Sequence, residues 1–225
     1  MLRRYSLIVI VITFFSIGSL SAQTTGEWIG AELSLNLPHK FSFDVSGQAR
    51  ILNNYLNLYK YQAQFDLGYE LHKRVDVGVS YRSEWRVEKD GYFYYRDKMF
   101  AEVKFNYPVN RFKFKDRIRY QRRRKTYIND DWDLIPIQRL RNKLELSYNI
   151  RKNKITPLVS FELFFPLNSF ITPVVDEYRI AVDIKYPISK KQSIKTGILY
   201  SRELYFDTLY AILFRFTYTF KMKIK

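Results

Sequence analysis

Apolar and polar side chains alternate with a period of two along most of this chain. Within residues 41–51, for example, Phe41, Phe43 and Val45 are separated by the polar residues Ser42 and Asp44. Successive side chains of a β-strand point to opposite faces, so the alternation predicts strands with one apolar and one polar face. Eleven such segments follow one another between residues 28 and 220, which predicts an all-β fold.

The connections between these segments alternate in length. The short turns are residues 37–40, 72–74, 108–111, 151–154 and 187–192, and most of the other connections are longer. Short turns on one side and long loops on the other are typical of outer-membrane barrels, whose short turns face the periplasm. We therefore predict an antiparallel transmembrane β-barrel of about 10–12 strands, in the cell outer membrane of a Gram-negative bacterium. Alternation alone also allows a soluble β-sandwich.

The number of strands is the open question in this prediction. Bacterial single-chain barrels have even numbers of strands, yet we count eleven segments. We expect either ten spanning strands preceded by a short β-segment at residues 28–35, or twelve strands. Aromatic residues make up 18% of the chain, which suits a barrel with aromatic girdles at both membrane interfaces.

The first 22 residues have the pattern of a cleaved signal peptide. Arg3 and Arg4 precede an apolar stretch at residues 7–17, and small residues lead to a predicted cleavage before Gln23. The alternative is an N-terminal transmembrane anchor, for which the apolar stretch is short. We therefore expect one domain, a barrel over residues 23–225. The chain has no Cys, which excludes a thiolate metal site and a lipid anchor on an N-terminal Cys.

Several local patterns resemble an uncharacterised bacterial outer-membrane barrel family, domain of unknown function 2490. These patterns are Trp28-Ile29-Gly30, Gln48-Ala49-Arg50, Arg117-Ile118-Arg119-Tyr120 and the Pro157…Phe161-Glu162 strand. The resemblance covers the mature chain and implies an outer-membrane barrel, without implying an activity.

Residues suited to catalysis are few. The two histidines, His39 and His72, both fall in predicted periplasmic turns, and we find no phosphate-binding loop or metal-ligand motif. We expect no cofactor and no catalytic residues. The favoured function is a non-enzymatic barrel, either structural or a narrow porin-like solute channel. The alternative function is an outer-membrane lipid hydrolase or lipid-modifying enzyme.

The predicted inner face carries many charged side chains. The lumen-lining candidates are Arg50, Asp66, Glu70, Arg82, Glu84, Arg117, Arg119, Arg139, Arg141, Glu145, Glu162, Arg179 and Arg215. One interpretation is a packed lumen, in which opposite charges on facing strands pair with one another. The other is a water-filled pore whose basic wall favours anions. About ten strands lie between ~8, which side chains fill, and ~16, which leave an open channel.

A basic run, Arg122, Arg123, Arg124 and Lys125, begins the longest predicted loop. Arginine binds phosphate bidentately, so these residues are candidate contacts for lipopolysaccharide phosphates at the outer surface. The alternative is that they pair with Asp130, Asp131 and Asp133 of the same loop. An exported barrel has no reason to meet nucleic acid, so the expected partners are outer-membrane lipid, lipopolysaccharide and the barrel-insertion machinery.

Two polar residues interrupt the apolar faces of their segments. Asp116 lies between Phe114 and Ile118, and Asn142 lies between Leu140 and Leu144. A hairpin centred near residue 129 would place them opposite each other. One explanation is a β-bulge that turns Asp116 inward. The other is a hydrogen bond between the two residues beneath a second protomer or a partner protein, which makes them candidate interface residues and the chain a candidate homo-oligomer.

Overall fold

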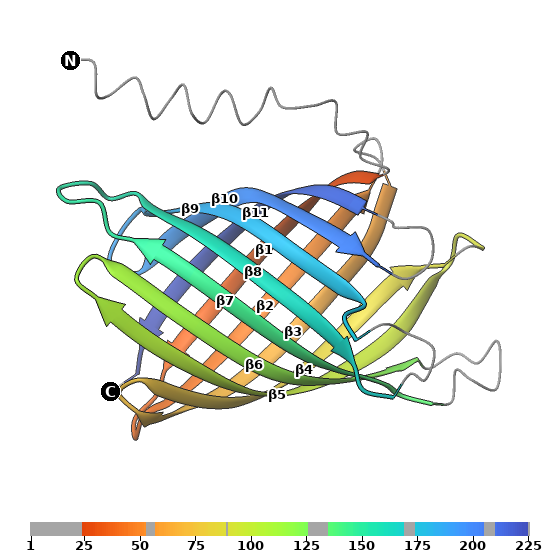
Figure 1. Cartoon of the computed structure of the whole chain (residues 1–225), viewed down its shortest axis with the longest axis horizontal. Coiled ribbons are helices and arrows are strands. Elements are labelled where there is room, and N and C mark those ends of the chain that lie inside the picture. Colours follow the sequence, from red (N-terminus) through yellow and green to blue (C-terminus); the bar gives the residue numbers. More distant parts are fainter. Residues whose placement is uncertain are drawn as a thin grey trace, which may run out of the picture.

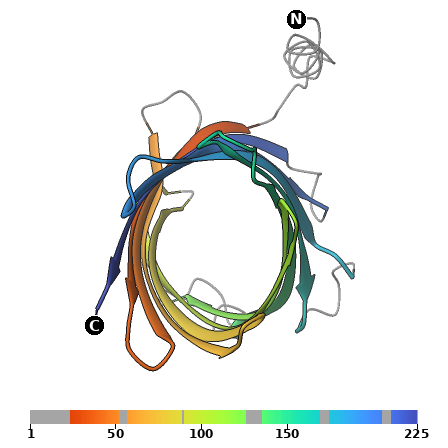
Figure 2. The same cartoon turned by 90° about the vertical axis from the view of Figure 1, so that its left-hand side faces the viewer.

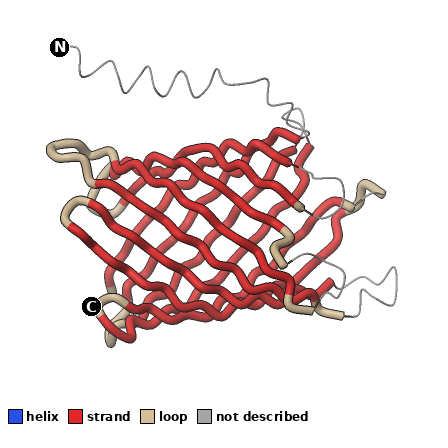
Figure 3. Tube along the Cα trace, viewed as in Figure 1, coloured by secondary structure: helices blue, strands red, loops and turns tan. Residues whose placement is uncertain are grey.

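The computed structural model describes residues 24–52, 57–88, 90–125, 135–168, 174–204 and 210–224. These residues form strands and turns and no helix (Figure 3). The strands are β1 (Thr24–Asn36), β2 (Phe41–Leu52), β3 (Asn57–His72), β4 (Val75–Val87), β5 (Phe93–Val109), β6 (Phe112–Lys125), β7 (Ile137–Tyr148), β8 (Thr156–Pro166), β9 (Glu177–Pro187), β10 (Gln192–Glu203) and β11 (Tyr210–Lys223). The predicted signal peptide falls outside the described residues.

The strands close into a single barrel, as Figures 1 and 2 show. Each strand pairs antiparallel with the next one along the chain, and β1 pairs with β11 to complete the cylinder. In this last pair the two strands run in the same direction, with Thr24 beside Ala211 and Asn36 beside Lys223. The closure pairs the two strands that would otherwise be exposed edges.

The predicted all-β barrel of about 10–12 strands is confirmed, whereas the expectation of an even strand number is wrong. The segment at residues 28–35 belongs to a full barrel strand of 13 residues, and the described residues form eleven strands in total. An odd number of up-and-down strands leaves the first and last strands parallel. An even number is required only where the closing pair is antiparallel, and here a parallel ladder closes the barrel.

The two ends of the barrel differ, as expected from the connection lengths. The short turns gather at the left-hand end in Figure 1, and the longer connections lie at the other end. Among the described residues, the non-glycine residues with positive φ lie in short turns: His39, Lys40, Asn110 and Lys152. Consecutive left-handed residues, as at His39 and Lys40, give the twist that a tight hairpin needs. β1 begins at the long-loop end, and β11 ends at the short-turn end.

The outer face of the barrel is apolar and the inner face is polar, the reverse of a soluble protein. Phe65, Val79 and Phe214 on the outer face are 43%, 55% and 50% exposed, whereas Glu84 on the inner face is 1% exposed. Membrane barrels alternate in this way because the outer side chains face lipid.

Aromatic side chains on the outer face form contacts near both ends. Near the long-loop end, Tyr61 stacks on Trp85 with ring centroids 5.0 Å apart. Near the short-turn end, the rings of Phe112 and Tyr148 lie 4.8 Å apart, and Phe41 contacts Tyr69. Two aromatic bands separated along the barrel axis match the girdles of membrane barrels.

Candidate functional site: the charged lumen

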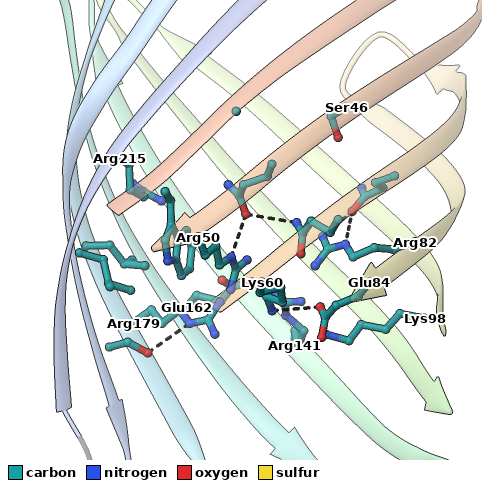
Figure 4. A pocket seen from close by; sticks show the side chains of 18 of the residues that line it. Ser46, Arg50, Lys60, Arg82, Glu84, Lys98, Arg141, Glu162, Arg179 and Arg215 are labelled. Carbon is teal, nitrogen blue, oxygen red and sulfur yellow. Dashed lines mark hydrogen bonds and ion pairs between the residues drawn. The ribbon is translucent and has the colours of Figure 1, made fainter. Parts of the chain in front are cut away.

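The barrel encloses a cavity of about 580 Å³ that residues from all eleven strands line. Fourteen basic and five acidic side chains lie along it, so its wall carries an excess of positive charge. Figure 4 shows ten of the lining side chains with labels, among them Arg50, Glu84 and Arg179. The cavity is therefore the main feature of the described residues at which a charged solute can be bound.

On one side of the cavity the basic residues are paired with carboxylates. Glu162 on β8 forms ion pairs with Arg117 and Arg141, whose Nη2 atoms lie 2.7 and 2.8 Å from the same carboxylate oxygen. Glu177 on β9 pairs with Arg179 at 2.6 Å. The two Glu162 contacts are cross-strand ion pairs, as expected of a packed lumen, whereas Glu177 and Arg179 pair within β9.

Arginines and aromatic rings alternate along the inner wall. The Arg50 guanidinium lies 3.6 Å from the centre of the Trp28 ring, and Arg179 lies 5.6 Å from it on its way to Phe164. Arg179 and Arg141 lie 4.6 and 4.5 Å from the centre of the Phe164 ring. The series passes over β10 and β11, whose inner side chains there are small or apolar. Cation–π contacts hold these guanidinium groups in place without neutralising their charge.

A buried triad lies on the opposite side of the cavity. One carboxylate oxygen of Glu84 accepts from Lys60 at 3.0 Å and from Lys98 at 2.7 Å, and all three residues are buried. Neither lysine is among the lumen residues predicted from the sequence. Continuing the alternation back from Gln62 to Lys60, and placing Lys98 on the same face as Glu102, would have found them.

The structure places most of the predicted lumen residues on the cavity wall. The lining includes Arg50, Arg82, Glu84, Arg117, Arg119, Arg139, Arg141, Glu162, Arg179 and Arg215. Asp66, Glu70 and Glu145 do not line the cavity. Asp66 accepts from Ser80 and Gln64, Glu145 pairs with Lys143 at 3.3 Å, and Glu70 is exposed.

The basic run at residues 122–125 does not begin a loop, because β6 continues to Lys125. Alternation along the strand therefore divides the run between the two faces. Arg123 lines the cavity, whereas Arg124 lies on the outer face and pairs with Asp97 at 2.8 Å. Arg122 lies beside Asp97 and Met99, also on the outer face. The three aspartates of the predicted loop fall outside the described residues.

Asp116 and Asn142 lie on the outer face and hydrogen-bond to each other. The Asn142 amide donates to the Asp116 carboxylate at 2.7 Å. No register shift interrupts β6, so the predicted bulge at Asp116 is wrong. The hairpin is displaced from the expected register, since Asp116 is opposite Leu144 and Asn142 is opposite Ile118. The two polar residues are diagonal neighbours, and whether a partner covers them stays a prediction.

Comparison with known proteins assigns the chain to a family. Residues 25–208 match the family described as "Protein of unknown function (DUF2490)". The chain belongs to the DUF2490 family. A search of curated proteins finds no match to it.

Among solved structures, this DUF2490 protein is similar to one titled "NanC porin structure in rhombohedral crystal form". The TM-score is 0.50 at 14% sequence identity, over 80% of this chain and 87% of that one. The similarity shows a porin-like barrel fold.

Of the two histidines of this DUF2490 protein, His39 lies in a turn and His72 ends β3, both at the short-turn end, and both are exposed. His72 accepts a hydrogen bond from the Arg74 backbone at 3.4 Å. Across the described residues, no group of three or more His, Asp or Glu side chains is placed to hold a metal ion. No helix in this part of the chain is both long and apolar enough to span a membrane.

Proposed function

We propose that this DUF2490 protein is an outer-membrane channel that passes small anionic solutes through a narrow basic lumen. The observation that carries the proposal is the cavity of about 580 Å³, lined by all eleven strands, with fourteen basic and five acidic side chains. An excess of like charge inside a low-dielectric wall concentrates its field in the pore, which favours counter-ions.

The arrangement of the inner wall supports a narrow pore over a structural plug. Ion pairs occupy the β7–β9 side, and the opposite side keeps uncompensated arginines along open space. Eleven strands lie between the ~8 that side chains fill and the ~16 of an open porin. The apolar outer face, the two aromatic bands and the porin-like fold support placement in an outer membrane.

Planar bilayer recording tests the channel directly. The purified full-length protein is expected to give discrete conductance steps, with a reversal potential in a KCl gradient that shifts toward the chloride equilibrium value. Absence of conductance, or a shift toward the potassium value, would contradict the proposal. Membrane placement is tested separately: the folded protein is expected in the outer-membrane fraction and to migrate faster on a gel before boiling. Recovery in the soluble periplasmic fraction would contradict it.

A further inference from the structure

We propose that six basic side chains on the β2–β6 wall form a binding site for a soluble polyanion with closely spaced oxyanion groups. The six residues, which we call the cationic patch, are Arg50, Lys60, Arg82, Arg86, Lys98 and Arg123, and all of them line the cavity. The inference deepens the proposed channel function, on which it rests for the route of the ligand into the barrel.

The cationic patch consists of two rows of like charge. Arg50, Lys60 and Arg86 are register partners on β2, β3 and β4. In the second row, Arg82, Lys98 and Arg123 are register partners on β4, β5 and β6. Directly opposed side chains have Cβ atoms about 4.5–5.5 Å apart, and like charges at that spacing are destabilising. The folded barrel therefore holds these cations together at a cost.

Glu84 is the carboxylate among these rows, and the two lysines already use it. Lys60 and Lys98 both donate to the same Glu84 oxygen, at 3.0 and 2.7 Å. Glu84 is 1% exposed and lies between the lysines in Figure 4. One carboxylate against six cations leaves the cationic patch with an excess of five positive charges.

Neutral groups position Arg50, Arg82 and Arg86, and among the described residues none of the four arginines of the cationic patch forms an ion pair. The Arg50 Nε donates to the Gln48 side chain at 2.9 Å, and the Arg82 Nε donates to Gln64 at 2.7 Å. The Arg86 guanidinium lies 4.7 Å from the centre of the Tyr59 ring. The Nε atoms of Arg86 and Arg123 are buried without a hydrogen-bond partner. These guanidinium groups are held in place with donors to spare, as an anion site requires.

Outside the cationic patch, every lining cation except Lys195 on β10 has an ion pair among the described residues. There Arg117 and Arg141 share Glu162, while Arg139 and Arg179 are paired with Asp176 and Glu177. A uniformly basic pore would leave cations unpaired on every wall. The excess charge is instead concentrated on β2–β6, near the long-loop end of the barrel.

The chemistry of the cationic patch selects the class of ligand. Guanidinium groups bind phosphate and carboxylate oxygens bidentately, and several adjacent cations match several adjacent oxyanion groups. The cavity of about 580 Å³ is within the range of small-molecule sites, about 300–1,000 Å³. A monovalent anion would neutralise one of the five excess charges, so the site favours a polyanion. Inorganic pyrophosphate is the simplest probe of this kind.

Calorimetric titration of the full-length barrel in detergent tests the site without requiring conduction. Pyrophosphate is expected to bind at least about ten times more tightly than orthophosphate. Arg86→Gln is expected to weaken pyrophosphate binding by about tenfold or more, as for loss of one charged hydrogen bond. The matched control is Lys185→Gln, on the inner face of β9 but outside the cavity lining, where Lys195 is its register partner. It removes the same charge from another like-charge pair and is expected to change the affinity by less than about twofold.

Two results would overturn the site. One is that pyrophosphate does not bind the wild-type barrel. The other is that Lys185→Gln weakens pyrophosphate binding as much as Arg86→Gln does, which would indicate attraction by the overall positive charge of the lumen and not by the cationic patch. Thermal unfolding without ligand separates binding from structure. Shortening a like-charge row is expected to leave the Arg86→Gln melting temperature unchanged or higher, so a parallel loss of melting temperature and affinity would also refute the site. Binding without conductance refutes the channel alone, and conductance without binding refutes the site alone.

Discussion

Asn142 donates a hydrogen bond of 2.7 Å to Asp116 from a diagonal position across the β6–β7 hairpin. Both residues lie on the apolar outer face, between Phe114, Ile118, Leu140 and Leu144 in sequence. The bond gives each polar side chain a partner within its own chain. Each residue therefore provides the hydrogen-bond partner that the other would lack against lipid.

Asn142→Leu is expected to destabilise the barrel more than the double change Asp116→Leu, Asn142→Leu. The single change leaves the Asp116 carboxylate without its donor, at a cost of about 1–3 kcal/mol, whereas replacing both partners by apolar groups is close to neutral. Urea unfolding in lipid vesicles measures the difference, and equal destabilisation by both variants would contradict it. A covering protomer further predicts that the double variant dissociates in detergent; an unchanged elution position would remove support for that interface.

Glu84→Gln is expected to lower the unfolding free energy by about 3–5 kcal/mol, because it leaves two buried lysines without a compensating charge. Lys60→Met is the matched control, since Glu84 then keeps Lys98 at 2.7 Å. We expect the smaller loss for Lys60→Met in urea titrations of the two variants. A Lys60→Met barrel less stable than the Glu84→Gln barrel would show that the carboxylate is not the centre of the triad.

Gly197→Ala is expected to destabilise the barrel by about 1–3 kcal/mol through overpacking. A methyl group at Gly197 would collide with the Val182 carbonyl oxygen and with the Asp183 side chain, which pairs with Arg215. Gly47→Ala on the outer face meets no atom within 4 Å and serves as the control. The melting temperatures of the two folded variants should differ, with only the Gly197 variant clearly below wild type.

Replacement of Asp176 by Asn is expected to change how stability depends on pH. Burial raises the pKa of the Asp176 carboxyl, an effect that Arg139 opposes. A carboxyl whose pKa is raised by folding penalises the native state when ionised, and the penalty disappears as the pH falls through the folded pKa. The urea midpoint of Asp176→Asn, measured relative to that of wild type, should therefore decrease as the pH is lowered from about 7 to about 4.

Asp90 provides the opposite case for comparison. Hydrogen bonds from the Tyr94 hydroxyl and the Tyr92 backbone lower the pKa of the Asp90 carboxyl. The ionised Asp90 carboxylate therefore stabilises the folded barrel at pH values above its pKa in the unfolded chain. This stabilisation is lost as the pH falls through its pKa in the folded barrel. The midpoint of Asp90→Asn relative to wild type should rise on acidification, and the same sign for both variants would contradict these assignments.

Arg122 and Arg124 are the members of the basic run that we propose as contacts for lipopolysaccharide phosphates. Both lie on the outer face, whereas Arg123 lines the cavity. Replacing Arg122 and Arg124 by Gln is expected to weaken stabilisation of the detergent-solubilised barrel by added lipopolysaccharide. Arg123→Gln is the control. If Arg123→Gln has the larger effect on this stabilisation, the outer-face assignment is wrong.

Alternation predicted the segments and their two faces because each strand carries its own period-two pattern. The same pattern, applied within residues 122–125, divides Arg123 from Arg124 without a structure. Closure of the barrel could not be predicted in this way, because the β1–β11 pairing joins the two ends of the fold. The contact between Trp28 and Arg179 was equally hidden, since it spans two intervening strands, from which Leu199 and Leu213 pack against Trp28.

The parallel pairing of β1 and β11 makes their seam the weakest strand pairing in the barrel. Parallel ladders are slightly less stable per residue than antiparallel ones, and every other neighbouring pair in this barrel is antiparallel. No hairpin links the two strands, so only the ladder from Thr24 and Ala211 to Asn36 and Lys223 keeps them together. When a lateral force opens the barrel in the bilayer, the hydrogen bonds between β1 and β11 should break first. During insertion the same hydrogen bonds should form last.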